Sequence, residues 1–211
     1  TSPQQRMRFY KLFEDYAAQD IIEYELIGDP ALRERCLAVQ NQKIQDTMES
    51  MPDKAAEYKF LGELYMKRGM PDESIENYTQ SLQVNPDDAE THYNLGIVYA
   101  QKGSMDQARK ALDQAVRLNP GYEAVVHKIL GIAFFRQGDL KAAILALQEY
   151  LQMQPDDFQI HNQLGAALAQ EGLLDLAIEH FTAALKINPG FESAYENLKI
   201  ARSLKESPQP Q

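Results

Sequence analysis

The stretch Leu61-Gly62-Glu63-Leu64-Tyr65 decides the fold of this chain, because variants of it return three times at an almost constant spacing. The other copies are Leu95-Gly96-Ile97-Val98-Tyr99, Leu130-Gly131-Ile132-Ala133-Phe134 and Leu164-Gly165-Ala166-Ala167-Leu168. Their glycines lie 34, 35 and 34 residues apart. A fixed period of this size is typical of stacked copies of one supersecondary unit and not of a single globular core.

The residues between the copies divide each period into two predicted helices. A second glycine ends the first helix, and we expect it to adopt the left-handed conformation of a helix C-cap; these glycines are Gly69, Gly103, Gly138 and Gly172. In the second helix a small residue is followed four positions later by a bulky one, in the pairs Ser74 and Tyr78, Ala108 and Leu112, Ala143 and Leu147, and Ala177 and Phe181.

The glycine of each Leu-Gly pair needs a packing reason, since glycine inside a helix costs about 1 kcal/mol relative to alanine. We predict that it lets the two helices of a unit approach closely, with the small residue of the second helix facing it.

This pattern resembles the tetratricopeptide repeat family, whose further marks are an aromatic residue after the Leu-Gly pair and a closing Asn-Pro, here Asn85-Pro86, Asn119-Pro120 and Asn188-Pro189. The resemblance implies an all-α fold, a right-handed α-solenoid of four helix-turn-helix repeats over residues 55–191. Residues 192–205 repeat the first-helix pattern with Lys199 in the place of the glycine, so we predict a C-terminal capping helix. We expect residues 206–211 to form a disordered tail.

Residues 1–54 are predicted to form an N-terminal helical pair stacked on the first repeat. Gly28 lies 34 residues before Gly62, in phase with the array, but Pro30 would break the first helix of a regular unit. The pair is therefore either a degenerate repeat or a separate element.

Composition excludes several classes of partner. The 31 acidic and 21 basic residues give a net charge of −10, which opposes binding to nucleic acid. No run of about 18 apolar residues occurs, so we predict no membrane insertion by this chain. Cys36 is the only cysteine, which excludes an internal disulfide and favours a cytoplasmic location. The chain begins with Thr1, so a periplasmic or membrane-tethered location stays open if an upstream segment was removed.

The residues that invite a catalytic or metal-binding interpretation have structural explanations. His92, His127 and His161 occupy equivalent places, but stacked helices lie about 8–10 Å apart and zinc needs nitrogens about 2.1 Å from one ion. We predict half-buried structural histidines and no metal site. Asp87-Asp88 and Asp156-Asp157 precede helices and are predicted to cap them. No nucleophile motif or phosphate-binding loop occurs, so we predict no catalytic residues and no cofactor.

The resemblance implies that a partner is held on a concave face lined by the first helices. Mapping that face onto this sequence predicts a peptide-binding site formed by Lys59, Tyr93, Asn94, Ile97, Val125, Lys128, Ile132, Phe135 and Arg136. Lys59 and Asn94 match two places of the clamp by which one branch of the family binds chaperone tails. Glu63 and Val125 replace other clamp residues, so chaperone-tail binding is disfavoured.

We therefore predict a non-catalytic scaffold that binds a peptide or helix of a partner protein in its groove. Self-association, which would make the chain a homo-oligomer, is one alternative. Another is that the chain is the scaffold arm of a larger enzyme, itself possibly membrane-anchored. A further alternative is that residues 6–27 cover part of the apolar strip that Tyr93, Ile97, Val125, Ile132 and Phe135 would form.

Overall fold

The computed structural model describes residues 42–43, 46–47, 51 and 53–206. The chain divides into two units, residues 1–52 and 53–211, and the second unit contains the repeats. Its helices are α3 (Lys54–Lys67), α4 (Pro71–Val84), α5 (Ala89–Lys102), α6 (Met105–Leu118), η1 (Pro120–Tyr122), α7 (Glu123–Gln137), α8 (Leu140–Met153), α9 (Phe158–Gln170), α10 (Leu174–Ile187) and α11 (Glu192–Glu206). No strand occurs in these ranges. The predicted all-α solenoid is confirmed. The predicted N-terminal pair lies almost wholly outside the described residues, as do residues 207–211.

The predicted turn glycines end the first helix of every repeat. Gly69, Gly103, Gly138 and Gly172 all have positive φ, between 69° and 81°. This left-handed conformation is cheap only for glycine. At Gly103 the amide donates back to the carbonyls of Tyr99 and Ala100, which closes the helix. The chain then reverses into the second helix.

The glycines of the Leu-Gly pairs stand at close contacts between the two helices, as predicted. A Cβ added at Gly96 would lie 2.5 Å from Leu112 Cγ, and one at Gly131 would lie 2.6 Å from Leu147 Cδ2. Tyr78 and Phe181 occupy the same place against the other two glycines. The prediction of a small facing residue was therefore wrong in detail: the nearest atoms belong to the bulky residue four positions later. In the first repeat the small residue has a separate contact with the glycine, because Ser74 Oγ donates a hydrogen bond to the Gly62 carbonyl at 2.8 Å.

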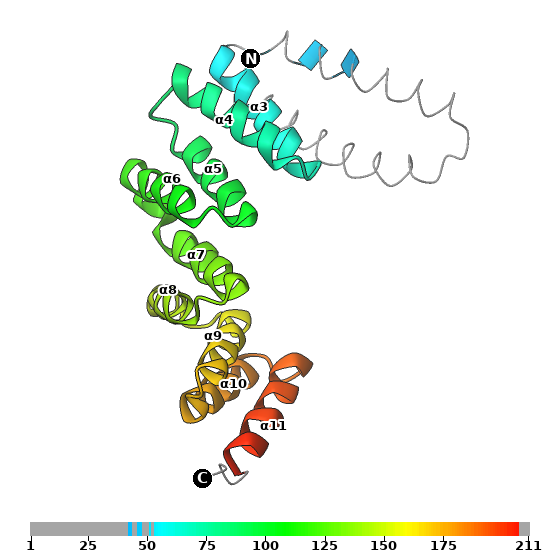
Figure 1. The fold of residues 1–211 in the computed structure, drawn as a ribbon, viewed down its shortest axis with the longest axis vertical. Helices are drawn as coiled ribbons and strands as arrows, with labels where there is room; N and C mark the ends of the chain where they lie inside the picture. Colours follow the sequence, from blue (N-terminus) through cyan, green and yellow to red (C-terminus); the bar gives the residue numbers. More distant parts are fainter. Residues whose placement is uncertain (1–41, 44–45, 48–50, 52, 207–211) are drawn as a thin grey trace, which may run out of the picture. The chain divides into compact units, whose positions relative to one another are not determined.

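The helix pairs follow one another from α3 to α11 (Figure 1). Each second helix contacts the first helix of the next repeat. The first helices α3, α5, α7, α9 and α11 also contact each other in succession, and no comparable contacts join the described second helices. First helices that approach each other more closely than second helices must form the inner layer of the stack.

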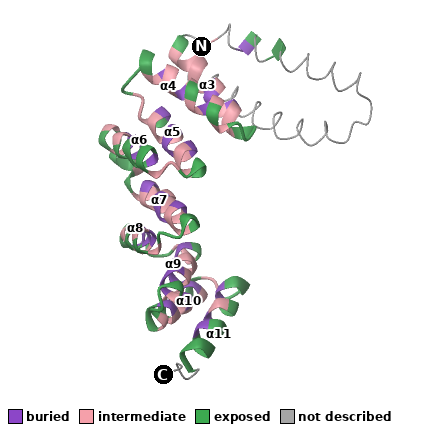
Figure 2. Cartoon of the chain, viewed as in Figure 1, coloured by how far each residue is buried: buried purple, intermediate pink, exposed green. Residues whose placement is uncertain are grey.

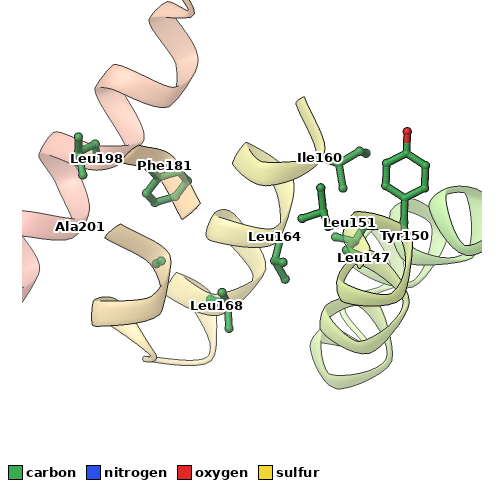
Figure 3. Packing of buried hydrophobic residues seen from close by; sticks show 10 residues of the cluster. Leu147, Tyr150, Leu151, Ile160, Leu164, Leu168, Phe181, Leu198 and Ala201 are labelled. Atoms are coloured by element: carbon green, nitrogen blue, oxygen red, sulfur yellow. The ribbon is translucent and has the colours of Figure 1, made fainter. Parts of the chain in front are cut away.

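Each repeat buries one side of its helices and exposes the other (Figure 2). In the last two repeats the core is one continuous cluster that includes Leu147 of α8, Leu164 of α9, Phe181 of α10 and Leu198 of α11. Figure 3 shows these side chains on four successive helices. Helix α11 buries Ala194, Leu198 and Ala201 against the stack, at the registers where α9 buries Ile160, Leu164 and Ala167. It therefore closes the solenoid in the position of a first helix.

The junctions between repeats are held by ionic and aromatic contacts. Lys59 Nζ contacts Asp88 Oδ2 at 3.2 Å, and Lys128 Nζ contacts Asp157 Oδ2 at 2.8 Å. In the other two junctions, rings meet: Tyr93 stacks on Tyr122 with centroids 4.6 Å apart, and Phe158 meets Phe191 edge to face. The period of 35 residues contains one residue more than the others, and η1 lies within it between α6 and α7, which remain in contact.

Among the described residues, no helix has both the length and the apolar character required to cross a membrane.

Candidate functional site

The inner face of the first helices carries a recurring set of apolar side chains. The residues directly after the repeat glycines are Glu63, Ile97, Ile132 and Ala166, and Ile200 occupies the same register on α11. The first four are half-buried, whereas Ile200 is 55% exposed. Phe135 and Leu204 lie one turn further along their helices, and Leu204 is 54% exposed. We call Ile97, Ile132, Phe135, Ile200 and Leu204 the inner strip.

Three predicted site residues belong to this apolar surface in different ways. Ile97 and Phe135 are half-buried and belong to none of the three core clusters of the described residues. Ile132 packs against the large core cluster of the last two repeats, so it contributes to stability as well. Apolar side chains that the fold does not use are available for contact with another molecule.

The predicted lysines are engaged inside the stack. Lys59 bridges Asp88 and Glu90 of the next repeat, and Lys128 bridges Asp157. Burial by itself would lower the pKa of each ammonium group, but its carboxylate partners raise the pKa above the usual value. These two residues hold neighbouring repeats together before any partner arrives.

The remaining predicted residues lie around the strip. Tyr93 is half-buried and stacked on Tyr122, so it presents one ring of an aromatic pair. Val125 is half-buried in the first turn of α7. Asn94 is half-buried, and its side chain makes no hydrogen bond to another described residue. Arg136 is exposed at the end of α7 and has no ion pair within the described ranges.

Ile200 and Leu204 were missed from the sequence. The capping helix is predicted from Lys199 in the place of the glycine, and Lys199 and Arg202 are both exposed on α11. The available signal was the period itself, because Ile200 lies 34 residues after Ala166. The apolar inner strip thus continues to the end of the stack.

An acidic group lies at the other end of the strip. Glu63 is half-buried and forms no ion pair or hydrogen bond with a described residue. Burial raises the pKa of its carboxyl, and Glu90 and Asp88 add to this rise, while Lys59 and Lys67 oppose it without cancelling it. Glu63 therefore holds a negative charge that the fold itself leaves poorly compensated.

In each predicted pair of aspartates the second residue caps the following helix, whereas Asp87 and Asp156 accept no capping hydrogen bond. Asp88 Oδ1 accepts from the amides of Glu90 and Thr91, and Asp157 Oδ1 accepts from those of Gln159 and Ile160. Burial alone would raise the pKa of Asp157, but hydrogen bonds from Lys128 and Tyr150 lower it below the usual value. Such carboxylates remain charged at neutral pH and serve as anchors of the junctions.

The three equivalent histidines are half-buried, as predicted, and each has a hydrogen-bonding partner. His92 and His161 each place Nε2 at 2.9 Å from a proline carbonyl, and His127 Nδ1 lies 2.8 Å from Glu149. His161 Nδ1 also lies 3.0 Å from Nδ1 of His180. No group of three metal-ligating side chains occurs in the part of the chain that is described.

Acid should weaken the fourth repeat through this histidine pair. Burial and the neighbouring His161 lower the pKa of His180 from 6.5 to about 4. The unfolded chain therefore takes up this proton more readily, and stability is lost as the pH falls from 6.5 towards 4 and is fully present above 6.5. After allowance for partial exposure we expect a loss of about 1 kcal/mol. Urea unfolding across this pH range measures the loss.

The matched variant for this prediction is His180→Gln, which removes the titrating group. Its stability should vary less with pH between 6.5 and 4 than that of the unmodified chain. An equal pH dependence in both proteins would contradict the assignment to His180.

Comparisons with known proteins agree with this architecture. Models of the tetratricopeptide repeat match residues 87–156 and 130–190, and a TPR repeat model matches residues 62–103. Among curated proteins, the peroxisomal targeting signal receptor of Saccharomyces cerevisiae is 32% identical over 72 residues, which is 34% of this chain and 12% of the receptor. The chain thus spans only a small part of that relative.

Solved structures give the same fold over a larger share of the chain. A crystal structure of MamA protein is 30% identical to this chain and has a TM-score of 0.64. The match covers 74% of this chain and 84% of the MamA chain. YrrB, described as a TPR protein with an unusual peptide-binding site, is 24% identical with a TM-score of 0.60, over 77% of this chain and 84% of that one. At this identity the likeness to YrrB concerns the fold alone.

Proposed function

Because this chain belongs to the tetratricopeptide repeat family, we propose that it holds a peptide segment of another protein against the inner strip of its first helices. Repeats of this family typically form non-catalytic modules for protein interaction, which supports a protein-interaction scaffold as the role of this chain.

The inner strip is the observation that carries this proposal. Ile97, Ile132 and Ile200 occupy the same register of their first helices, and Ile200 and Leu204 are more than half exposed. Exposed apolar residues scattered singly need no explanation, but a row of them along one face marks a surface for another molecule. The peroxisomal targeting signal receptor is, by its name, a receptor for a targeting signal, which supports a peptide as the ligand.

The mechanism is burial of the partner's apolar side chains on a rigid platform. The ion pairs of Lys59 and Lys128 fix the spacing of the repeats in advance, so little conformational entropy is lost on binding. Tyr93 adds an aromatic contact beside the strip, and Asn94 and Arg136 supply polar groups at its edges. Binding energy comes mainly from the apolar contacts, and the edge charges set orientation.

The location of the binding site can be tested with peptides that the chain selects from a random display library. A photoreactive benzoylphenylalanine placed at Phe135 should crosslink these peptides, because Phe135 lies in the inner strip. The same group at Leu145, which is 59% exposed on α8 of the same repeat, is the control. Crosslinking that is equal at both positions, or stronger at position 145, would contradict the proposal.

A further inference from the structure

Two histidine rings meet between the helices of the fourth repeat. His161 lies on α9 and His180 on α10, and their Nδ1 atoms are 3.0 Å apart. The ring centroids are 5.2 Å apart, and the ring planes are inclined by 31°. Both side chains are only half-buried, so the pair is not closed off from solvent. In the three earlier repeats the positions equivalent to His180 are Asn77, Ala111 and Ala146, so the fourth repeat alone contains this pair.

A backbone carbonyl fixes which nitrogen of His161 carries the proton. The Nε2 atom of His161 lies 2.9 Å from the carbonyl oxygen of Pro155. A carbonyl only accepts hydrogen bonds, so Nε2 donates, and the neutral ring turns the lone pair of Nδ1 toward His180. Histidines that bind metal ions almost always donate their other ring N–H to a carbonyl, a carboxylate or water. His161 therefore has the tautomer and the orientation of a metal ligand.

His180 can supply the second lone pair. Without an ion, the proton between the two Nδ1 atoms belongs to His180, because His161 can only accept there. Among the described residues, Nε2 of His180 has no hydrogen-bond partner and is not enclosed, so water can carry this proton to it. Burial and the neighbouring His161 lower the pKa of His180, so protons compete little with a metal ion at neutral pH.

The spacing of the two rings suits one shared ion. Two imidazoles that bind an ion at about 2.1 Å and at a tetrahedral angle have nitrogens about 3.4 Å apart and ring centroids about 5.3 Å apart. The centroids of His161 and His180 lie close to this separation. Rotation of the rings in place, about the broad terminal torsion of histidine, opens the two nitrogens by the missing distance of about 0.4 Å. Neither α9 nor α10 has to move.

We propose that Nδ1 of His161 and Nδ1 of His180 together bind one Zn²⁺ or Cu²⁺ ion, whose remaining positions are held by water. Imidazole nitrogens are suitable ligands for both metals. Unlike the equivalent histidines of neighbouring repeats, these two belong to one repeat and can reach the same ion. The ion connects α9 to α10 and stabilises the fourth repeat, and neither ligand belongs to the inner strip. The acid-induced loss predicted above for His180 concerns the chain without the ion.

Zinc titration of the untagged chain tests this inference. Zinc should raise the midpoint of urea unfolding, because the ion binds the folded chain, in which the two rings are held together. His161→Gln and His180→Gln should each weaken zinc binding in calorimetry about tenfold or more, since even loss of a residue that only supports a metal ligand costs about 10–100-fold. His92→Gln is the matched control and should bind zinc unchanged. The Nε2 atom of His92 also lies 2.9 Å from a proline carbonyl, but Ala111 takes the place of a second histidine.

The imidazole nitrogen signals in NMR identify the ligands without any change to the protein. The chain contains four histidines, so each signal can be assigned with one variant. Zinc should shift the Nδ1 signals of His161 and His180 and leave those of His92 in place. Magnesium, which prefers oxygen ligands, should shift none of them. Equal zinc affinity of His180→Gln and the unmodified chain, equal shifts at His92 and His161, or no binding at a large excess of zinc would overturn the inference.

Discussion

Replacing Gly131 with leucine is expected to destabilise the protein by about 3 kcal/mol or more, the largest effect on folding that we predict for one substitution. A Cβ at this position would lie 2.6 Å from Leu147 Cδ2 and 3.2 Å from the backbone nitrogen of Leu147. The leucine side chain can rotate away, but the backbone of α8 cannot move without separating α7 from α8. Urea unfolding followed by circular dichroism measures the loss.

The position of Gly131 in the stack shapes this loss. It lies in the third repeat, and a repeat protein is held together by contacts between nearest neighbours. Damage there should uncouple the first two repeats from the last, so that unfolding occurs in two steps. Gly190→Ala is the control, because a Cβ at Gly190 would meet only Asn188 Oδ1, at 3.7 Å. An unchanged midpoint for Gly131→Leu would refute the close-contact explanation of the glycine column.

The sequence predicted best those features that the backbone alone imposes. Gly138 was assigned to a left-handed turn and Gly131 to a close helix contact, and both assignments follow from the absence of a side chain. The partner of Gly131 was assigned to Ala143, yet Leu147 fills the space. The direction of a side chain from its helix decides this, and sequence spacing alone does not supply it.

The inner face was harder to predict because its charges depend on neighbouring repeats. Lys59 and Lys128 were expected to surround the strip and meet a partner, but each forms ion pairs with the helix start of the next repeat. One signal was present in the sequence, since both lysines lie 29 residues before their aspartates. A separation that recurs in a periodic chain indicates contact across a repeat junction.

The double substitution Ile97→Ser with Phe135→Ser should have the largest effect on binding. Buried interface anchors often cost about 2 kcal/mol or more each on truncation, so affinity for a selected peptide should fall by about a thousandfold. Folding should change little, because both side chains are only half-buried and lie outside the core clusters of the described residues. Calorimetric titration and urea unfolding of the same preparation measure both quantities.

Ile132 is left unchanged in this variant for a physical reason. It packs against the cluster of the last two repeats, so Ile132→Ser would lower stability and affinity together and leave the two effects inseparable. Leu145→Ser removes an exposed apolar side chain from α8 and should alter neither quantity by much. If the double variant loses stability while the affinity of its folded fraction is retained, Ile97 and Phe135 belong to the core or are covered by other parts of the chain. The peptide would then have to bind elsewhere, and a search would begin with the exposed apolar residues of the second helices, Val84, Leu145 and Leu176.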